Sequence, residues 1–339
     1  MNKILIDAAR IAALAGGLAA AGLAGAQTKE VTIGYQDMVV PYRMAQEAKA
    51  LETATGYKIN WKQFGGGGEV IKAMASGAVQ VGEVGSAGIA AAVSRGEPLE
   101  LFWILDDIGD AEALVAKNGS GINTVADLKG KKIAMPFNST THFHTMVALE
   151  QAKVNPSDVQ ILNMRPPEVR AAWQRGDIQA TFIWDPVLAE VKKDGKVIIS
   201  SGKISADTGK ATFDGYVANK DWAKANRDFM VKFVKVMADA DANYRANAAK
   251  WTKDSGEVKA VAKWSGAKPE DVPAGMALYR FPSAADQASA KWLGGGKDGV
   301  AAKALAATAA FQLSQKQIEK TLPDYSVAVN SSYAQQVAK

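Results

Sequence analysis

The chain has 339 residues, with 40 Lys and Arg against 35 Asp and Glu, a formal net charge of +5 and no cysteine. A basic excess this small, scattered along the whole chain, argues against nucleic acid as a partner. The lack of cysteine excludes disulfides, a Cys-ligated metal and a lipid anchor attached through an N-terminal cysteine.

Residues 1–26 are predicted to be a cleaved secretory signal peptide. Lys3 and Arg10 give a positive start, residues 11–26 carry no charge, and Ala24-Gly25-Ala26 precedes the expected cut. The alternative is a membrane anchor, but this uncharged stretch is shorter than the roughly 20 apolar residues that span a bilayer. We therefore expect a periplasmic protein without its leader.

From residue 27 the pattern alternates between strands and helices, which predicts an α/β sheet. The expected strands are 31–36, 58–64, 79–84, 99–105 and 113–117, with helices over 44–54, 69–76 and 86–95 between the first four. A second, smaller α/β series follows, with strands 132–135, 160–163, 178–184 and 197–200 and helices 141–153, 168–175 and 186–193. The pattern after residue 221 is helical throughout: 222–247, 255–265, 283–293 and 300–313.

Two stretches share one plan. Residues 70–86 and 171–186 each run from a helix through a glycine turn into a strand, and the strand ends in polar or aromatic residues. Gly77 and Gly176 stand where each helix stops, so we expect positive φ there. Open α/β sheets bind ligands at such strand ends, which predicts a cleft.

Four segments carry a resemblance to a known family. They are Met74-Ala-Ser-Gly-x-Val-Gln-Val-Gly-x-x-Gly-Ser86, Ala171-Ala-Trp-Gln-Arg-Gly-Asp-Ile178 with Trp184-x-Pro186, Phe137-Asn-Ser-Thr-Thr-His142, and Thr212-Phe-Asp214. With them the chain resembles the substrate-binding proteins of ABC importers for taurine and alkanesulfonates, most closely the taurine branch.

The resemblance implies an α/β, type II periplasmic-binding-protein fold: two α/β lobes joined by a two-crossing hinge. Residues 27–113 and 217–339 would form lobe I and residues 114–216 lobe II, with crossings near 113–117 and 216–219. A hinge of this kind closes a cleft. The implied function is capture of taurine by a monomer that delivers it to a permease in the inner membrane.

Two helix starts are expected to hold an anion. Gly85, Ser86 and Ala87 follow a strand and open a helix, and Thr140, Thr141 and His142 do the same in the other lobe. Backbone N–H groups at the positive end of a helix suit a sulfonate. The plainer alternative is that Ser86 only caps its helix. The run Gly65–Gly68 lacks the Gly-Lys-Ser/Thr ending of a phosphate loop, so we expect a flexible turn at the rim of the cleft.

The amine of a taurine-like ligand needs a carboxylate, and the resemblance points to Asp214, which the residues alone equally allow as a turn acid. Trp184 is a candidate to lie against the ligand, or a core residue. Gln36 and Asp37 follow the first strand, with Gln36 placed to donate its amide. Asp107 is one of several extra acids near strand ends, with Asp106 and Asp185; these acids suit either a larger cationic group or the solvated surface.

No enzyme, cofactor or metal site is expected. There is no cysteine nucleophile, and the only histidines, His142 and His144, are two residues apart, which on a helix points them in different directions. Three functions remain open at this stage: a taurine receptor, a receptor for another aliphatic sulfonate or small anion, and a partner-binding protein without a small ligand.

Overall fold

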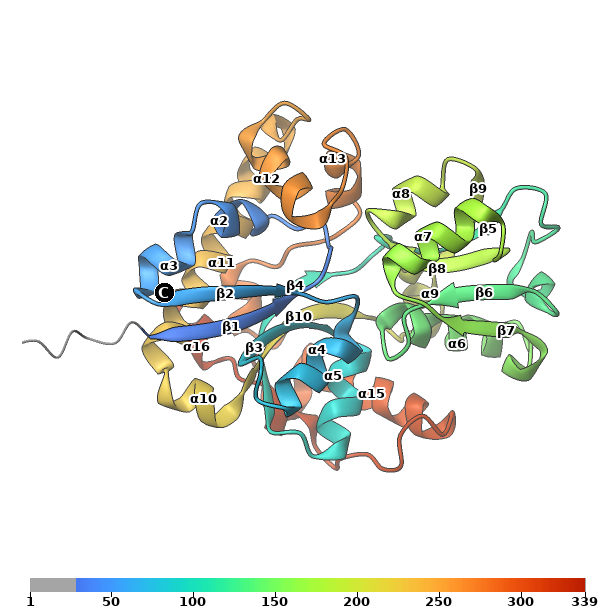
Figure 1. Cartoon of the computed structure of the whole chain (residues 1–339). Helices are drawn as coiled ribbons and strands as arrows, with labels where there is room; N and C mark the ends of the chain where they lie inside the picture. The colour runs from blue at the N-terminus through green and yellow to red at the C-terminus, as the bar shows by residue number, and fades with distance from the viewer. Residues whose placement is uncertain (1–28, 339) are drawn as a thin grey trace, which may run out of the picture.

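The computed structural model describes residues 29–338, so the expected signal peptide, residues 1–26, lies outside the described residues. Two lobes, each built on a five-stranded mixed sheet, stand side by side (Figure 1). We call them lobe I, the larger, and lobe II. Within the described chain, no helix combines the length and the apolar character that crossing a membrane requires.

Both sheets have the same strand order. Sheet I runs β2 (Lys58–Gln63), β1 (Glu30–Tyr35), β3 (Val81–Gly85), β10 (Phe213–Asn219), β4 (Leu99–Asp107). Sheet II runs β7 (Gln160–Asn163), β6 (Lys132–Met135), β8 (Ala180–Trp184), β5 (Glu112–Lys117), β9 (Gly195–Ser200). The fourth strand of each, β10 or β5, is antiparallel to both of its neighbours. The α/β two-lobe fold is thus confirmed.

Helices cover both faces of each sheet. Lobe I holds α2 (Arg43–Glu47), α3 (Ala50–Thr55), α4 (Gly67–Ala75), α5 (Ser86–Arg95), α10 (Lys220–Ala225), α11 (Arg227–Asn247), α12 (Gly256–Ser265), α13 (Val272–Met276), α14 (Ala284–Ala288), α15 (Val300–Ser314) and α16 (Ser332–Val337). Lobe II holds α6 (Thr140–Gln151), α7 (Pro166–Arg175), α8 (Val187–Val191) and α9 (Ser201–Thr208). In Figure 1, α2, α3 and α11 lie on one side of sheet I, and α4 and α5 on the other.

The chain passes between the lobes twice. Because β5 lies wholly in sheet II and β10 wholly in sheet I, the crossings are residues 108–111 and 209–212. Each comes a few residues before the segment in which the sequence suggested it. The strands themselves are held by hydrogen bonds on both edges, so the short links before them are the parts left to bend.

Local signals decide where helices begin and end. Gly77 and Gly176 have φ of 77° and 78°, which confirms the repeated helix, turn and strand plan. The helix expected over 44–54 is two helices, because Lys49 takes a left-handed φ of 52° between them. The helix expected over 222–247 is also two, divided at Asn226, whose amide donates to the carbonyl of Trp222 at 2.8 Å.

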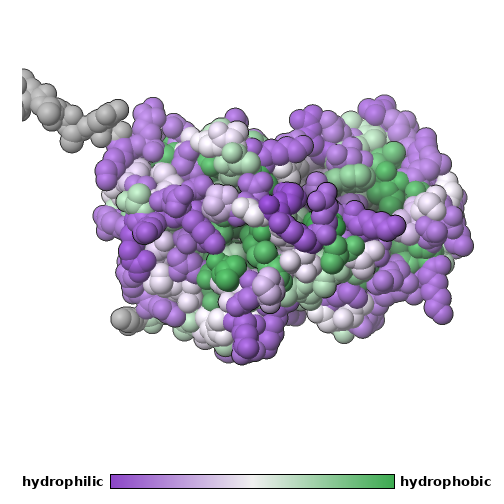
Figure 2. Space-filling model, turned by 90° about the horizontal axis from the view of Figure 1, so that it is seen from below, coloured by the Kyte–Doolittle hydropathy of each residue, from purple (hydrophilic) through white to green (hydrophobic). Residues whose placement is uncertain are grey.

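The helices after β10 pack on lobe I, where α11 contacts α3, α15 contacts α5 and α16 contacts β4. Phe233 of α11 lies edge-on to Phe102 of β4 and Tyr216 of β10, at 5.4 and 4.9 Å between ring centroids. On the face seen from below, hydrophobic residues show as separate patches among hydrophilic ones (Figure 2). This packing buries most apolar side chains of the tail, while Val300, Leu313 and Val327 stay exposed.

Candidate functional site

A small, nearly closed cavity lies between the lobes. Lobe I contributes Gln36, Met38, Gly67, Gly85, Asp214 and Tyr279, and lobe II contributes Glu112, Ser139, Thr140 and Trp184. A larger, more open hollow lies between α2, α3, α11 and α12, on lobe I alone. The first cavity gathers polar groups from both lobes at the ends of strands and at three helix starts, so we take it as the candidate site.

Three helices begin at this cavity. Gly67 starts α4, Gly85 precedes the first residue of α5, and Ser139 precedes Thr140, the first residue of α6. The first N–H groups of a helix have no partner within it, and the helix dipole adds partial positive charge there. No Lys, Arg or His in the described chain lines the cavity. An anionic group would therefore be held by backbone N–H groups.

The glycine run Gly65–Gly68 has a larger role than the rim turn that the sequence suggested. Gly67 is buried and opens α4, beside the start of α5: a Cβ added to Gly67 would lie 3.5 Å from the backbone nitrogen of Gly85. The run thus brings a third helix start to the two that the sequence predicted. Its glycine-only spelling gave no sign of this, because glycine runs are equally common in plain turns.

Three glycines of lobe I, Gly65, Gly85 and Gly275, lie against side chains of lobe II. A Cβ added to Gly85 would lie 2.8 Å from Thr140 Cγ2, one added to Gly65 would lie 2.8 Å from Arg165 Cδ, and one added to Gly275 would overlap Asp185 Oδ2. All three partners belong to lobe II. Since real Cβ atoms do not approach other atoms so closely, side chains at these positions would hold the lobes apart. The structure is a closed form.

Trp184 and Asp37 join the lobes above the cavity. The indole Nε1–H of Trp184, at the end of β8, donates to Asp37 Oδ1 at 2.9 Å. Asp37 follows β1 and does not line the cavity, so the structure places it as a partner of Trp184 rather than beside a ligand. Burial raises the pKa of Asp37 to about 6. The Trp184 ring is 4% exposed and does line the cavity, as the sequence predicted.

Acidic groups lie beside two of the helix starts: Asp214 pairs with Gly85 in sheet I, and the hydroxyl of Thr140, the first residue of α6, donates to Glu112. Asp214 is 6% exposed, and no residue between 29 and 338 donates a hydrogen bond to its carboxylate. Its register partner Asp106 is fully buried, and neither oxygen has a partner in the described chain. Burial, followed by neighbouring carboxylates, raises the pKa of both groups well above the usual range. No basic side chain of the described chain lines the cavity beside these carboxyl groups.

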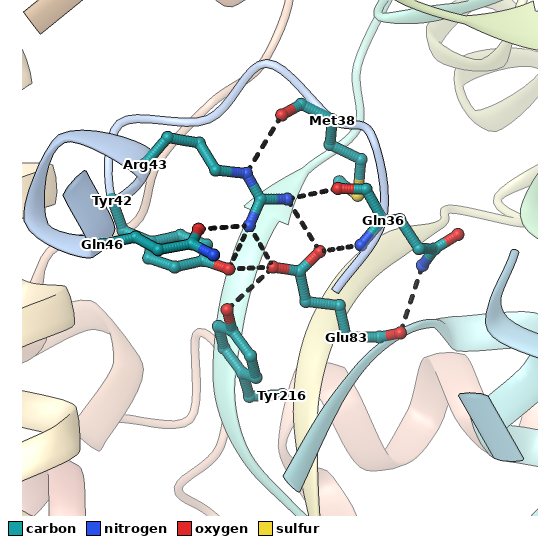
Figure 3. Close-up of polar contacts among 7 residues, drawn as sticks. All are labelled: Gln36, Met38, Tyr42, Arg43, Gln46, Glu83 and Tyr216. Atoms are coloured by element: carbon teal, nitrogen blue, oxygen red, sulfur yellow. Dashed lines mark hydrogen bonds and ion pairs between the residues drawn. The ribbon is translucent and has the colours of Figure 1, made fainter. Parts of the chain in front are cut away.

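Gln36 is held in place by a buried network (Figure 3). Its backbone N–H donates to Glu83 Oε2 at 2.8 Å, and its side-chain Nε2 donates to the Glu83 carbonyl at 3.1 Å. The Arg43 guanidinium binds the Gln36 carbonyl at 2.6 Å and both Glu83 carboxylate oxygens at 2.8 and 3.0 Å. The Tyr216 hydroxyl also donates to Glu83 at 2.8 Å. One amide hydrogen of Gln36 is thus used within the protein, and its side-chain oxygen stays available to the cavity.

Of the eleven residues predicted for the site, five line the cavity: Gln36, Gly85, Thr140, Trp184 and Asp214. Besides Asp37, the other five make contacts within the protein. Ser86 accepts a hydrogen bond from the Phe213 N–H at 3.4 Å, the Ala87 carbonyl accepts one from Gln312, the Thr141 and Ser139 hydroxyls pair at 2.8 Å, His142 stacks on Phe137, and Asp107 pairs with Arg280 at 3.5 Å. Burial lowers the pKa of His142 to about 4, so it is neutral near pH 7 and adds no positive charge.

Sequence reasoning missed Met38, Gly67, Glu112, Ser139 and Tyr279 as cavity residues. Glu112 is the first residue of β5, the strand near which the first crossing was expected. An acid at the first position of a strand after a hinge is a sequence signal that could have predicted a cavity residue. Ser139 was part of the quoted motif and is the N-cap of α6, where its hydroxyl accepts the His142 N–H at 3.2 Å. Tyr279 lies in a link between helices, where no pattern marks it.

Known proteins resemble this chain in sequence and in fold. Residues 34–260 match the family described as ABC transporter, phosphonate, periplasmic substrate-binding protein. The taurine-binding periplasmic protein of Escherichia coli K12 is 35% identical over 310 residues, which cover 91% of this chain and 94% of that protein. The alkanesulfonate-binding protein SsuA of Xanthomonas axonopodis pv. citri, solved with MOPS, superposes with a TM-score of 0.71 over 91% of this chain and 99% of that one, at 24% identity. The aliphatic sulphonate binding protein SsuA of E. coli gives a TM-score of 0.69 over 91% and 100%, at 23% identity.

The buried Arg43–Glu83 pair predicts a large loss of stability when one partner is removed. Glu83→Gln leaves the Arg43 charge without its counter-ion inside the protein, which should lower the free energy of unfolding by about 3–5 kcal/mol. Chemical denaturation measures this change. Glu30→Gln, which breaks the exposed Lys58–Glu30 pair, is the matched control and should change little. Equal small effects of the two variants would contradict the prediction.

Proposed function

Because the chain belongs to the family of periplasmic substrate-binding proteins of ABC transporters, we propose that it binds taurine, 2-aminoethanesulfonate, in the interlobe cavity and delivers it to a membrane permease. The observation that carries the proposal is that one small cavity has three helix starts and an unpaired carboxylate, Asp214. The E. coli relative named for taurine, similar over nearly its whole length, supports the same ligand.

The two ends of taurine suit the two kinds of polar group that the cavity brings together, helix starts and carboxyl groups. A sulfonate stays ionised at physiological pH and accepts several hydrogen bonds, which suits the N–H groups at the starts of α4, α5 and α6. The ammonium suits Asp214 and the side-chain oxygen of Gln36. The two-carbon spacer would lie against Met38 and Trp184, which supply apolar wall.

The mechanism we propose follows from the contacts between the lobes. The starts of α4 and α5 belong to lobe I and that of α6 to lobe II, so a bound sulfonate touches both and stabilises the closed form over the open one. The permease would recognise the closed form. The protein acts as a monomer that carries the ligand from the periplasm without converting it.

Taurine should bind more tightly than ethanesulfonate, by at least about tenfold, because ethanesulfonate leaves the Asp214 carboxylate unpaired in a dry site. Isothermal titration calorimetry with both ligands measures the ratio. Asp214→Asn should weaken taurine binding by about the same factor and leave thermal unfolding nearly unchanged. Equal affinities for the two sulfonates would refute the amine site, and a preference for ethanesulfonate would favour a receptor for plain sulfonates.

The pH dependence of binding should have opposite signs for the two ligands. Burial raises the pKa of Glu112, which lines the cavity, to about 7. An ammonium nearby lowers that pKa, so the taurine complex holds fewer protons and taurine affinity should rise as the pH passes upward through about 7, then level off. A plain sulfonate raises the pKa, so its affinity should fall over the same window. Calorimetric titrations of both ligands at about pH 6 and pH 8 measure these changes in affinity. A change in the same direction for both ligands would count against the proposal.

Gly85→Ala should impair closure without impairing folding. Gly85 has φ of −68° and ψ of 152°, which alanine adopts freely, but the new Cβ would lie 2.8 Å from Thr140 Cγ2 of the other lobe and 3.0 Å from Asp214 Oδ1 of its own lobe. We expect taurine affinity to fall about tenfold or more, with the melting temperature of the empty protein nearly unchanged. Gly256→Ala is the control: it also stands at a helix start, but its Cβ would meet no atom within 4 Å, so affinity should stay the same. Wild-type affinity in Gly85→Ala would show that the lobes need not approach so closely.

A further inference from the structure

One acidic residue of the cavity, Glu112, has been given no contact with the ligand so far. Glu112 is the first residue of β5, so it belongs to lobe II, whereas Asp214 belongs to β10 in lobe I. Both side chains line the cavity, and Glu112 is only 3% exposed. A Cβ added to Gly85 would lie 3.0 Å from Asp214 Oδ1 and 3.5 Å from Thr140 Oγ1, and that Thr140 hydroxyl donates to Glu112, so the two carboxyl groups lie near each other. Two acids from opposite lobes therefore face the same small space.

Glu112 is the end of a chain of polar contacts inside lobe II. Its Oε1 is bound by the Thr140 hydroxyl, and its Oε2 lies 3.1 Å from Ser201 Oγ. Ser201 Oγ lies 2.8 Å from His144 Nδ1, and His144 Nε2 lies 2.9 Å from the backbone carbonyl of Lys210. His144 is fully buried. The contacts thus run from the cavity wall to a backbone carbonyl that can only accept.

The hydrogens that this series of polar contacts requires bear on the protonation of Glu112. The three contacts from Glu112 through Ser201 and His144 to the Lys210 carbonyl need three hydrogens, of which the serine hydroxyl and a neutral imidazole supply two. The third comes from a protonated Glu112 or from a protonated His144. Burial lowers the pKa of His144 to about 4 and raises that of Glu112 to about 7, so Glu112 is the group that takes up the proton near neutral pH. When protonated, Glu112 donates to Ser201 and adds no second negative charge beside Asp214; when ionised, it accepts from Ser201.

We propose that Glu112 is a second amine-binding carboxyl group, supplied by the lobe opposite to Asp214, and that it makes the cavity select sulfonates with a protonated amine over plain ones. The proposal rests on the proposed function, because it concerns the cationic end of the same ligand. A primary ammonium has three N–H donors, and the cavity offers three acceptors: Asp214, Glu112 and the Gln36 side-chain oxygen.

Binding of the ammonium changes the charge of Glu112. The positive charge between the two acids stabilises their ionised forms, so Glu112 gives its proton to solvent and accepts a charge-assisted hydrogen bond. The amine then links lobe I to lobe II, as the sulfonate does at the helix starts. The other titratable groups facing this region are Asp106, Glu83, Tyr279 and His144.

Glu112→Gln tests the assignment with little disturbance of the fold. The glutamine oxygen still accepts from Thr140, and its amide hydrogen replaces the acid hydrogen that is donated to Ser201. Calorimetry should show taurine binding weakened about tenfold to a hundredfold, with ethanesulfonate binding equal or tighter. Glu190→Gln is the matched control in the same lobe, since Glu190 pairs with Arg170 at 2.7 Å outside the cavity, and it should leave both affinities unchanged.

A second readout needs no variant. Taurine titrations of the wild type near pH 7, run in two buffers of different ionisation enthalpy, should show a proton released on binding, and ethanesulfonate should release none. Equal loss of both ligands in Glu112→Gln, unchanged taurine affinity, or no proton release from the wild type would each overturn the role of Glu112 while leaving taurine binding in place. A wild type that binds neither sulfonate would overturn the proposed function, and this inference with it.

Discussion

The close approach of the two lobes is the constraint on which the site depends. Gly65, Gly85 and Gly275 lie where any side chain would strike lobe II, so the glycines of lobe I are what allow the cavity to close down to a small volume. Closure removes water, and a dry site strengthens every electrostatic contact within it. Without that approach, the helix starts of lobe I and lobe II would remain apart and each would act alone.

Closure also explains the unusual distribution of charge. The cavity contains no basic side chain from the described chain, yet it lies among several buried carboxyl groups, including Asp106, Glu112 and Asp214. Partial positive charge comes only from the starts of α4, α5 and α6. Such a cavity is poorly suited to a simple anion and well suited to a zwitterion, because each end of a zwitterion meets the opposite charge. Burial raises the pKa of both Glu112 and Asp214, so a cation placed beside them would favour their ionised forms.

A hydrogen-bond network within each lobe holds a binding residue of the cavity in place. The Arg43–Glu83 pair, with Tyr216, fixes the chain that follows β1 and so holds Gln36 at the cavity (Figure 3). In lobe II, the contacts through Ser201 and His144 hold Glu112 in the same way. Hydrogen bonds of this kind keep the binding groups in position while the hinge segments bend, so closure moves whole lobes rather than single side chains.

The sequence alone determined the features that depend on neighbouring residues. Periodicity and glycine turns predicted the two α/β units and the positive φ at Gly77 and Gly176, and the strand ends placed Gly85 and Thr140 at a cleft, to which the family resemblance added Asp214. Only the tertiary structure decided which polar groups share the cavity. Glu112, Gly67 and Tyr279 come from segments far apart in the chain, and Asp37 is turned toward Trp184 instead of the ligand space. The reason is physical: helix and strand signals are local, whereas the direction of a side chain across a cleft depends on sheet register and on how closely the other lobe packs.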